Sequence, residues 1–331
     1  MRNARAIIVL LLVSGLLAIV APAPTTAGER KVLRVAHQQS VTNPFHLAAE
    51  KFAEGAAKRT NGMLEVQIFP GAQLGNQREL GEGVKIGTID CIVLSPANLD
   101  FLNPQMAAFD LPYLFRNREH AFKVLDGDIG RPIFEKLLRD HGVRTLNAME
   151  SGFRHFTSNK PINSMADLKG MKVRATPNKS VLKTFQALGA NPTVIAFPEL
   201  FSALQQGVVQ GQENPLSNIE SAKLYEVQKY LALTYHIFSP VHIFMSEMVF
   251  KTLSPDYQRA ILDAAKEAGT WERAYMVSQD GELLKRLKAV GMTVTEPKDL
   301  DKWAEAVQPV VKDFATEWGL PDWAEKVKSV K

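Results

Sequence analysis

The chain has a single cysteine and little net charge, and each of these shortages argues against certain classes of protein. Cys91 is the only cysteine among 331 residues, so no disulfide can form within the chain and a large core must stabilise the fold. Cys91 lies in the apolar stretch IDCIVLS, which favours a buried small side chain over a nucleophile. The sequence has 39 basic and 35 acidic residues. This near balance is not typical of nucleic-acid-binding proteins, so no nucleic-acid partner is expected.

Long hydrophobic runs are missing after the first 27 residues, and that first segment has the features of a secretory signal. Arg2 and Arg5 are basic, residues 6–20 are almost wholly apolar, and small residues and prolines follow. An apolar run of 15 residues is short for a membrane span of about 20. We predict a signal peptide over residues 1–27, cleaved after Ala27; an uncleaved anchor is the alternative. Loss of Arg2 and Arg5 would leave 37 basic against 35 acidic residues, a net charge near +2.

Familiar catalytic and metal-binding motifs are absent from the sequence. It has no GxxxxGK(S/T) phosphate loop, no GxSxG nucleophile elbow, no HExxH motif and no EF-hand loop. The stretch GEGVKIG at 81–87 misses GxGxxG by one residue and lies inside a helical pattern. No two of the seven histidines stand four residues apart, and carboxylates are not clustered. An exported chain of this kind is expected to bind a ligand rather than act as an enzyme, with no cofactor and no metal.

Hydrophobic periodicity over residues 31–95 predicts alternating strands and helices. The predicted strands are 31–37, 64–70 and 89–95, and the predicted helices are 43–62 and 76–87. Asn43 is a suitable cap for the first helix, and Pro44 suits its first turn. This β-α-β-α-β order is typical of a mostly parallel sheet with helices on both faces.

The alternation resumes after Gly142 and predicts a second α/β unit. Its strands are expected at 143–150, 153–158, 171–175 and 192–197, and its helices at 164–170 with Ser164 as cap, 180–190 with Ser180 as cap, and 198–207. A long helical tract at 254–291, with a potential interruption near Gly281, and a terminal helix at 299–318 follow. No glycine- or serine-rich linker separates the units, so we expect the chain to cross between them.

Arg174 stands at the end of the apolar strand pattern MKVRA, just before a predicted helix. Side chains at the carboxyl ends of strands in an α/β sheet face the crevice where ligands bind. An arginine there offers a planar fork that matches a carboxylate, and Asn178 and Ser180 begin a helix whose N-terminus adds positive potential. From position alone, a solvent-facing arginine is the commoner outcome.

Several motifs, in order along the mature chain, resemble the substrate-binding proteins of TRAP (tripartite ATP-independent periplasmic) transporters, the DctP-like family. They are AAEKFAE, FPGAQLGNQREL, FDLPYLF, DLKGMKVRATPN, VIAFPELFSALQQGVVQGQENPLSNI and KLYEVQKYLALTYH. The resemblance implies an α/β periplasmic binding protein of the two-domain Venus flytrap type, with crossing strands and a long connecting helix. The expected domains are 28–151 plus 240–285, and 152–239 plus 286–331.

The resemblance also implies which residues face the ligand. It assigns the carboxylate-clamping arginine to Arg174, a second cleft arginine to Arg154, the cleft aromatic to Phe197 and the cleft amide to Asn214. From the first domain it implies Gln38, Gln77 and Ser95. Structural roles are the alternatives: Arg154 could pair with Glu150 or Glu213, Phe197 could staple the following helix, and Asn214 could serve a turn. Gln210 departs from the family, which often has aspartate there.

The function implied is capture of a small organic acid in the periplasm for secondary uptake through the small and large permease subunits, without ATP. The ligand could be a sugar acid, a hydroxy acid or a C4-dicarboxylate. Neutral Gln38, Gln77 and Ser95 suit hydroxyl or keto groups, which favours a hydroxylated monocarboxylate. Arg154 could instead reach a second carboxylate, which keeps the C4-dicarboxylate open. Other functions that stay open are a binding protein for an ATP-driven importer or a sensor, and an exported enzyme acting on sugar acids.

Overall fold

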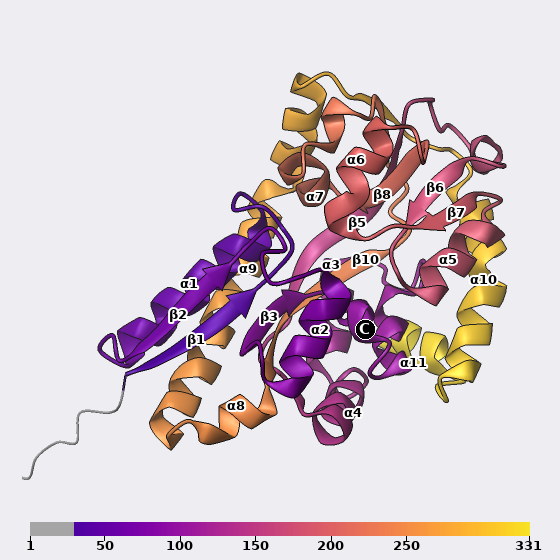
Figure 1. Cartoon of the computed structure of the whole chain (residues 1–331). Helices are drawn as coiled ribbons and strands as arrows, with labels where there is room; N and C mark the ends of the chain where they lie inside the picture. The colour runs from indigo at the N-terminus through magenta and orange to yellow at the C-terminus, as the bar shows by residue number, and fades with distance from the viewer. Residues whose placement is uncertain (1–29) are drawn as a thin grey trace, which may run out of the picture.

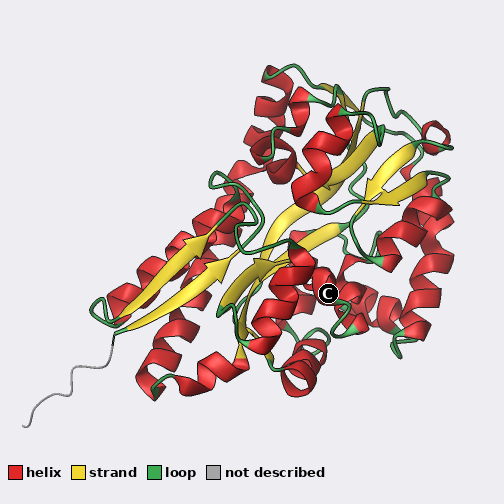
Figure 2. Cartoon of the chain, in the orientation of Figure 1, coloured by secondary structure: helices red, strands yellow, loops and turns green. Residues whose placement is uncertain are grey.

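The computed structural model describes residues 30–331, the side chain of Asp280 excepted. The expected signal peptide, residues 1–27, lies outside the described residues. Helices surround a long, twisted layer of strands in two lobes (Figures 1 and 2). The strands are β1 Lys31–Ala36, β2 Leu64–Phe69, β3 Cys91–Leu94, β4 Val143–Thr145, β5 Met149–Ser158, β6 Lys172–Ala175, β7 Asn191–Val194, β8 Gly211–Pro215, β9 Tyr230–Ala232, β10 Phe238–Ser246 and β11 Thr293–Thr295.

The helices cover both faces of this layer, as the alternating sequence pattern predicts. The α-helices are α1 Pro44–Arg59, α2 Gln77–Ile86, α3 Arg118–Asp126, α4 Arg131–His141, α5 Lys179–Ala187, α6 Leu200–Gln205, α7 Leu216–Ser221, α8 Glu247–Thr252, α9 Pro255–Ala289, α10 Leu300–Glu317 and α11 Trp323–Ser329. Short 3-10 helices are η1 Pro96–Leu99, η2 Pro104–Asp110, η3 Met165–Leu168, η4 Phe197–Glu199 and η5 Leu224–Glu226. Among the described residues, no helix combines the length and the apolar character needed to cross a bilayer.

Two long antiparallel strands, β5 and β10, carry the sheet from one lobe to the other. The sheet order is β2-β1-β3-β10-β5-β8-β6-β7. The end of β10 pairs with β3, and its beginning pairs with the beginning of β5. The end of β5 pairs with β8. The first lobe therefore holds β1–β4 with α1–α4, and the second lobe holds β6–β9 with α5–α7. This is the α/β two-domain arrangement with crossing strands that the sequence predicts.

Each lobe has its own hydrophobic cores. In the first lobe, Phe109 and Phe244 belong to one core, and Phe52 and Cys91 belong to another. Cys91 is fully buried, as its apolar strand predicts. In the second lobe, one core surrounds Phe156, Phe185 and Trp303, and another surrounds Leu200, Ile219 and Leu287.

The carboxyl-terminal segment differs from the expected division of the chain. Trp303 packs in the second lobe, but Phe314, Trp323 and Val327 pack in the first-lobe core that contains Phe109. The indole Nε1 of Trp323 donates a hydrogen bond to Ala108 O at 3.1 Å. The end of α10 and all of α11 thus return to the first lobe, where apolar surface is buried around Phe109. Apart from this segment, the boundaries 28–151 plus 240–285 and 152–239 plus 286–331 remain a proposal.

Helix α9 connects the lobes without a break. Ser254 caps it, and the helix continues through Gly281, where an interruption was expected. A glycine costs only about 1 kcal/mol in a helix interior, and Met276 and Leu283 on either side of Gly281 are buried. Ile261 packs with α1 in the first lobe, and Leu287 packs in the second. The long connecting helix of the predicted fold is therefore one continuous rod.

Local corrections concern a cap and a strand. Ser180 does not cap α5: the side chain of Asn178, in extended conformation, accepts hydrogen bonds from the backbone of Ser180 and Val181. The cap lies two residues earlier because Ser180 is already helical. The predicted strands 143–150 and 153–158 are instead a short β4 and a continuous β5 that passes through Gly152 at φ +93°.

Candidate functional site

Residues expected from the first domain lie where its strands end. Strands β1 and β3 are parallel, with Val35 opposite Cys91, so their carboxyl ends lie side by side. Gln38 follows β1, Ser95 follows β3, and Gln77 begins α2. In all three side chains a buried oxygen has no hydrogen-bond partner: Gln38 Oε1, Gln77 Oε1 and Ser95 Oγ. Buried polar atoms are normally paired, so these three oxygens are available for hydrogen bonds to a ligand.

Arg174 lies at the corresponding edge of the second lobe, as the penultimate residue of β6 and ahead of α5. Its side chain is 1% exposed, so it is not the solvent-facing arginine of the alternative interpretation. Nε donates to Ile195 O at 2.9 Å, while Nη1 is buried without a partner. Burial lowers the pKa of Arg174 to about 10, so the group remains a cation at neutral pH. A buried cation with an unused donor is suited to binding an anion.

The two edges meet across the lobes. Asn178, which caps α5 just after Arg174, donates through Nδ2 to Ala97 O at 3.4 Å. Ala97 belongs to η1, which begins directly after Ser95. Helix α5 also packs against η2. The segment after Arg174 and the segment after Ser95 are therefore in contact.

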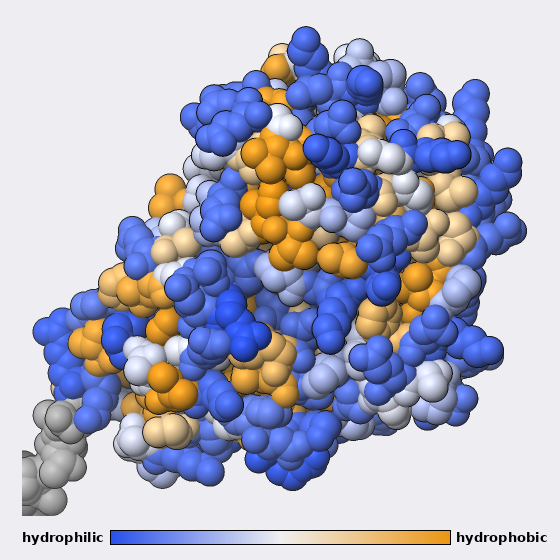
Figure 3. Space-filling view, turned by 45° about the vertical axis from the view of Figure 1, so that its right-hand side comes forward, coloured by the Kyte–Doolittle hydropathy of each residue, from blue (hydrophilic) through white to orange (hydrophobic). Residues whose placement is uncertain are grey.

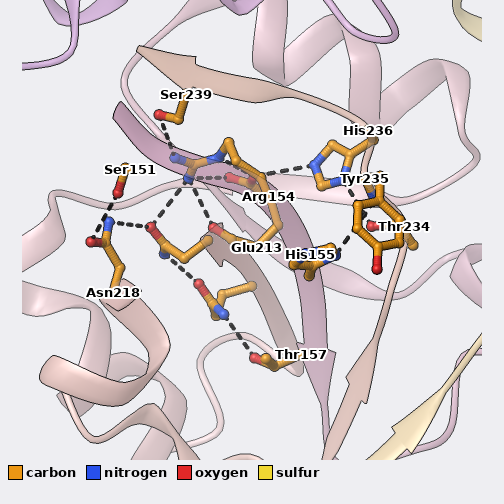
Figure 4. A network of polar contacts seen from close by, with 12 residues as sticks. Ser151, Arg154, His155, Thr157, Glu213, Asn218, Thr234, Tyr235, His236 and Ser239 are labelled. Atoms are coloured by element: carbon orange, nitrogen blue, oxygen red, sulfur yellow. Dashed lines mark hydrogen bonds and ion pairs between the residues drawn. The ribbon is translucent and has the colours of Figure 1, made fainter. Parts of the chain in front are cut away.

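Arg154 lies on β5 and is paired with Glu213 of β8 (Figure 4). Its Nε and Nη2 donate to the two carboxylate oxygens at 2.5 and 2.8 Å. Burial alone would raise the pKa of Glu213, but Arg154 outweighs it and holds that pKa at about 2. Of the two alternatives for a structural partner, Glu213 rather than Glu150 is the one observed. The positive charge of Arg154 is thus neutralised within the protein.

Two further side chains hold the Arg154–Glu213 pair. His236 Nε2 lies 3.2 Å from Glu213 Oε2, and Ser239 Oγ lies 3.4 Å from Arg154 Nη1. Burial lowers the pKa of His236, so its ring is neutral at pH 7 and can donate to the carboxylate without adding charge. The pair is therefore fixed from both sides, as Figure 4 shows.

Asn214 belongs to the same network and does not have a free amide. Its Oδ1 accepts from Arg154 Nη2 and from Asn218 Nδ2, both at 3.2 Å, and its Nδ2 donates to Gln212. Asn218 Oδ1 in turn accepts from Asn43 Nδ2 in the first lobe, at 2.9 Å. A continuous series of amide contacts therefore connects Arg154 with the N-cap of α1.

Phe197 is partly buried and packs against the second-lobe core around Leu200 and Ile219. Its segment lies near Arg174, because Ile195 provides the carbonyl that Arg174 contacts. The structure thus brings together Arg174, Arg154 and Asn214 in one lobe and Gln38, Gln77 and Ser95 in the other, with Phe197 at the border of the first group.

Sequence reasoning missed three residues that the structure brings to this region: Asp110, Asn43 as an interlobe contact, and Asn218. Asp110 lies in FDLPYLF, which entered the sequence analysis only as a resemblance, and its burial has no signal in the sequence. Asn43 was identified as a cap, and it is one: its side chain accepts from Phe45 N at 3.0 Å. In residues 30–331, no group of three or more histidine, cysteine or acidic side chains is arranged to hold a metal.

Comparisons with known proteins identify the family of this chain. Residues 35–317 match the family described as bacterial extracellular solute-binding protein, family 7. The 2,3-diketo-L-gulonate-binding periplasmic protein YiaO of Escherichia coli is 34% identical over 299 residues, which is 90% of each chain.

Solved structures extend the similarity to three dimensions. A TRAP periplasmic solute-binding protein from Polaromonas sp. JS666, bound to D-erythronate, is 36% identical with a TM-score of 0.87, covering 91% of this chain and 99% of that one. One from Sulfurospirillum deleyianum, with bound succinate, is 34% identical with a TM-score of 0.87, covering 92% of this chain and 100% of that one. The chain therefore belongs to family 7 of the bacterial extracellular solute-binding proteins, the family of the TRAP periplasmic solute-binding proteins.

Proposed function

We propose that this protein captures a small organic acid with one carboxylate and several hydroxyl groups, and delivers it to a TRAP permease. The observation that carries the proposal is the difference between its two cleft arginines. Arg174 has a buried donor without a partner, whereas Glu213 neutralises Arg154. Arg154, Glu213 and Arg174 together carry one net positive charge, which one carboxylate balances.

Each predicted residue has a role in this proposal. Arg174 binds the ligand carboxylate through Nη1, while its Nε stays on Ile195. Arg154 forms part of the protein surface beside the ligand, and Asn214 holds Arg154 in position by accepting a hydrogen bond from its Nη2. The ring of Phe197 lies at the edge of this surface. Gln38, Gln77 and Ser95 make hydrogen bonds to the rest of the ligand, for which their buried oxygens are available.

The hydroxylated monocarboxylate is favoured over the C4-dicarboxylate on grounds of charge. A second carboxylate would face Gln38, Gln77 and Ser95, which are neutral, and would lose hydration without gaining a cation. D-Erythronate in the Polaromonas structure is a ligand of the favoured kind, and the E. coli relative is named for another sugar acid. Succinate in the Sulfurospirillum structure represents the alternative.

Capture depends on closure of the lobes around the acid. A ligand that contacts both lobes favours the closed state by its difference in affinity for the closed and open forms. We infer that the mature protein works in the periplasm after removal of residues 1–27, and that its small and large permease subunits recognise the closed form. The face drawn in Figure 3 is mainly hydrophilic, with apolar side chains gathered over part of the second lobe. No ATP-dependent step and no catalysis are part of this proposal.

A calorimetric panel tests the function directly. D-Erythronate, L-galactonate, D-gluconate, lactate, succinate and malate are titrated into the mature protein, after a thermal-shift screen of the same acids. We expect at least one hydroxylated monocarboxylate to bind at least about tenfold more tightly than succinate, a difference of about 1.4 kcal/mol. Tight binding of succinate with no response to any hydroxylated monocarboxylate would contradict the proposal.

A further inference from the structure

Asp110 is a buried carboxyl group whose position the network around Arg154 does not explain. It ends η2, is 8% exposed, and its Oδ1 is buried without a hydrogen-bond partner. Other buried acids are anchored: Glu213 pairs with Arg154, and Asp90 accepts from the backbone of Arg34 at 2.7 Å. An unanchored carboxyl is costly inside a protein unless another group meets it.

The surroundings of Asp110 are those of the candidate site. Ser95, whose Oγ also lacks a partner within hydrogen-bonding geometry, is close enough to lower the pKa of Asp110. The charged groups that act on Asp110 are Arg154 from β5, Glu213 from β8 and Asp100 from the segment after η1. Helix η2 itself packs against η1 and α5, which carry the two edges of the site. Asp110 therefore lies between Ser95, at the first-lobe edge of the site, and Arg154.

The charges in this region do not allow two further anions. Arg154 and Glu213 neutralise each other, and His236 is neutral, so Arg174 is the one uncompensated cation among the described site residues. A ligand carboxylate compensates Arg174. An ionised Asp110 near the Arg154–Glu213 pair would then add a negative charge that no further cation of the site compensates, which burial disfavours. Consistent with this, burial raises the pKa of Asp110 to about 7.

We propose that Asp110 is a ligand-contacting residue that joins the closed site as a neutral carboxylic acid, hydrogen-bonds the hydroxyl group next to the ligand's carboxylate, and so couples binding to uptake of one proton. The neutral group offers one O–H donor and one carbonyl acceptor, and a hydroxyl group can serve both. The inference rests on the proposed function, because it places the ligand's carboxylate on Arg174. With Asp110 in this role, the protein prefers 2-hydroxy acids, and its affinity for them depends on pH.

The sign of the pH effect follows from linkage. An anion bound near Asp110 raises the pKa of that carboxyl further, so the complex holds more protons than the free protein. Affinity is therefore greatest below the pKa of the free protein and falls as pH rises above about 7. If one whole proton were taken up, the dissociation constant would rise about tenfold per pH unit.

The experiment compares wild-type protein with Asp110→Asn and Asp110→Ala, using Asp126→Asn as the control. The control removes a first-lobe carboxyl that pairs with Arg273 and is not among the charged groups that act on Asp110. The probes are D-erythronate and 3,4-dihydroxybutanoate, which lacks only the 2-hydroxyl group. If another 2-hydroxy acid of the panel binds more tightly, that acid and its 2-deoxy counterpart replace them. Calorimetry at pH 6, 7 and 8 provides the dissociation constants.

For wild-type protein and Asp126→Asn we expect affinity for D-erythronate to fall at least about threefold between pH 6 and pH 8, and for Asp110→Asn to change less than about twofold. Removal of the 2-hydroxyl group should cost wild-type protein about tenfold in affinity. In Asp110→Ala the same removal should cost less than about threefold. Equal pH profiles in wild-type protein and Asp110→Asn, or an equal hydroxyl preference in wild-type protein and Asp110→Ala, would overturn the proposal.

A measurement on the wild-type protein guards against variants that do not fold. Titrations at pH 7.5 in two buffers of different ionisation enthalpy report protons taken up on binding, and we expect uptake of a measurable fraction of one proton. No uptake would overturn the inference about Asp110 and leave the proposed function standing. Failure of wild-type protein to bind any hydroxylated monocarboxylate would instead refute the proposed function.

Discussion

The amide of Asn43 donates a hydrogen bond to Asn218 Oδ1 at 2.9 Å, joining segments that are 175 residues apart in the chain. Asn43 also caps α1, and Asn218 Nδ2 donates to Asn214, which contacts Arg154. One asparagine therefore serves local structure, lobe contact and the arginine network together. Because the contact crosses between lobes, we expect it to help stabilise the closed arrangement of the lobes.

Ser221→Ala tests the contribution of this interface without disturbing the cap. Ser221 Oγ accepts from Asn43 Nδ2 at 2.9 Å. Loss of one hydrogen bond of about 0.5–1.5 kcal/mol in the closed state should weaken ligand binding about two- to tenfold, with little change in the melting temperature. Calorimetry measures the first and thermal unfolding the second. Exposed Ser202→Ala is the control, and equal affinities in the two variants would contradict this role.

Scattering tests closure itself. We expect wild-type protein saturated with its tightest panel ligand to have a smaller radius of gyration than the free protein, because closure brings the lobes together. A profile that does not change at saturation would show a site that is closed before the ligand arrives.

Arg174→Lys should remove most ligand binding and leave the fold intact. Lysine keeps the charge but lacks the planar fork, so the carboxylate is poorly paired and binding loses about 2–5 kcal/mol. Calorimetry measures the loss, and circular dichroism checks the fold. Arg286→Lys, in the exposed ion pair with Glu220, is the matched control and should bind normally. Near wild-type affinity in Arg174→Lys would remove this residue from the carboxylate site.

Glu213→Gln should free the charge of Arg154 and change ligand preference. Breaking a buried ion pair on one side is expected to cost about 3–5 kcal/mol of stability. The site would gain one positive charge, so affinity for succinate should rise relative to D-erythronate. Glu220→Gln makes the same substitution in an exposed pair, where the cost should stay below about 1 kcal/mol. An unchanged ratio of the two affinities would indicate that Glu213 does not set the charge of the site.

His242→Phe should make the protein less sensitive to acid. His242 is buried between Phe134 and Phe244, and burial lowers its pKa to about 3. In the unfolded chain His242 is protonated below about pH 6.5, whereas in the folded protein it stays neutral until about pH 3. The free energy of unfolding therefore decreases as pH falls from about 6.5 toward 3. Between pH 7 and pH 5 the variant should lose about 2 kcal/mol less than wild-type protein in urea unfolding. Partly exposed His141→Phe is the control; equal losses in wild-type protein and His242→Phe would contradict the burial argument.

Cys91 should resist thiol reagents in the native protein. It is fully buried, and burial raises the pKa of its thiol, so little thiolate is present at pH 8. We expect labelling to become fast only after unfolding in urea. Rapid labelling of the native protein would show that the first-lobe core opens readily.

Strongly periodic segments were predictable from the sequence, and contacts between distant segments were not. The elements β1, α1, β2, α2 and β3 follow the predicted order because alternation and capping are local signals. The second strand pair and the cap of α5 were displaced because a continuous β5 and a two-residue reach by Asn178 depend on neighbours. The return of Trp323 to the first lobe rests on contact with Phe109, which no local pattern encodes.

The candidate site divides in the same way. The resemblance indicated Arg174 and Arg154, but their difference in charge balance depends on Glu213, which comes into register with Phe156, two residues after Arg154, only when β5 and β8 pair. Asp110 was not identified because its burial depends on tertiary packing of η2, mainly against η1 and β10, which no local pattern encodes. Sequence therefore predicts which groups are available, and tertiary contact determines which of them stay unsatisfied.

Helix α9 has a mechanical consequence. Its 35 residues form a rod about 52 Å long, anchored on α1 at one end and in the second lobe at the other. If this helix rotates slightly about its middle, its two ends move by several ångströms. Binding of an acid only a few ångströms across can thus change the outer surface of the molecule at positions far from the bound ligand.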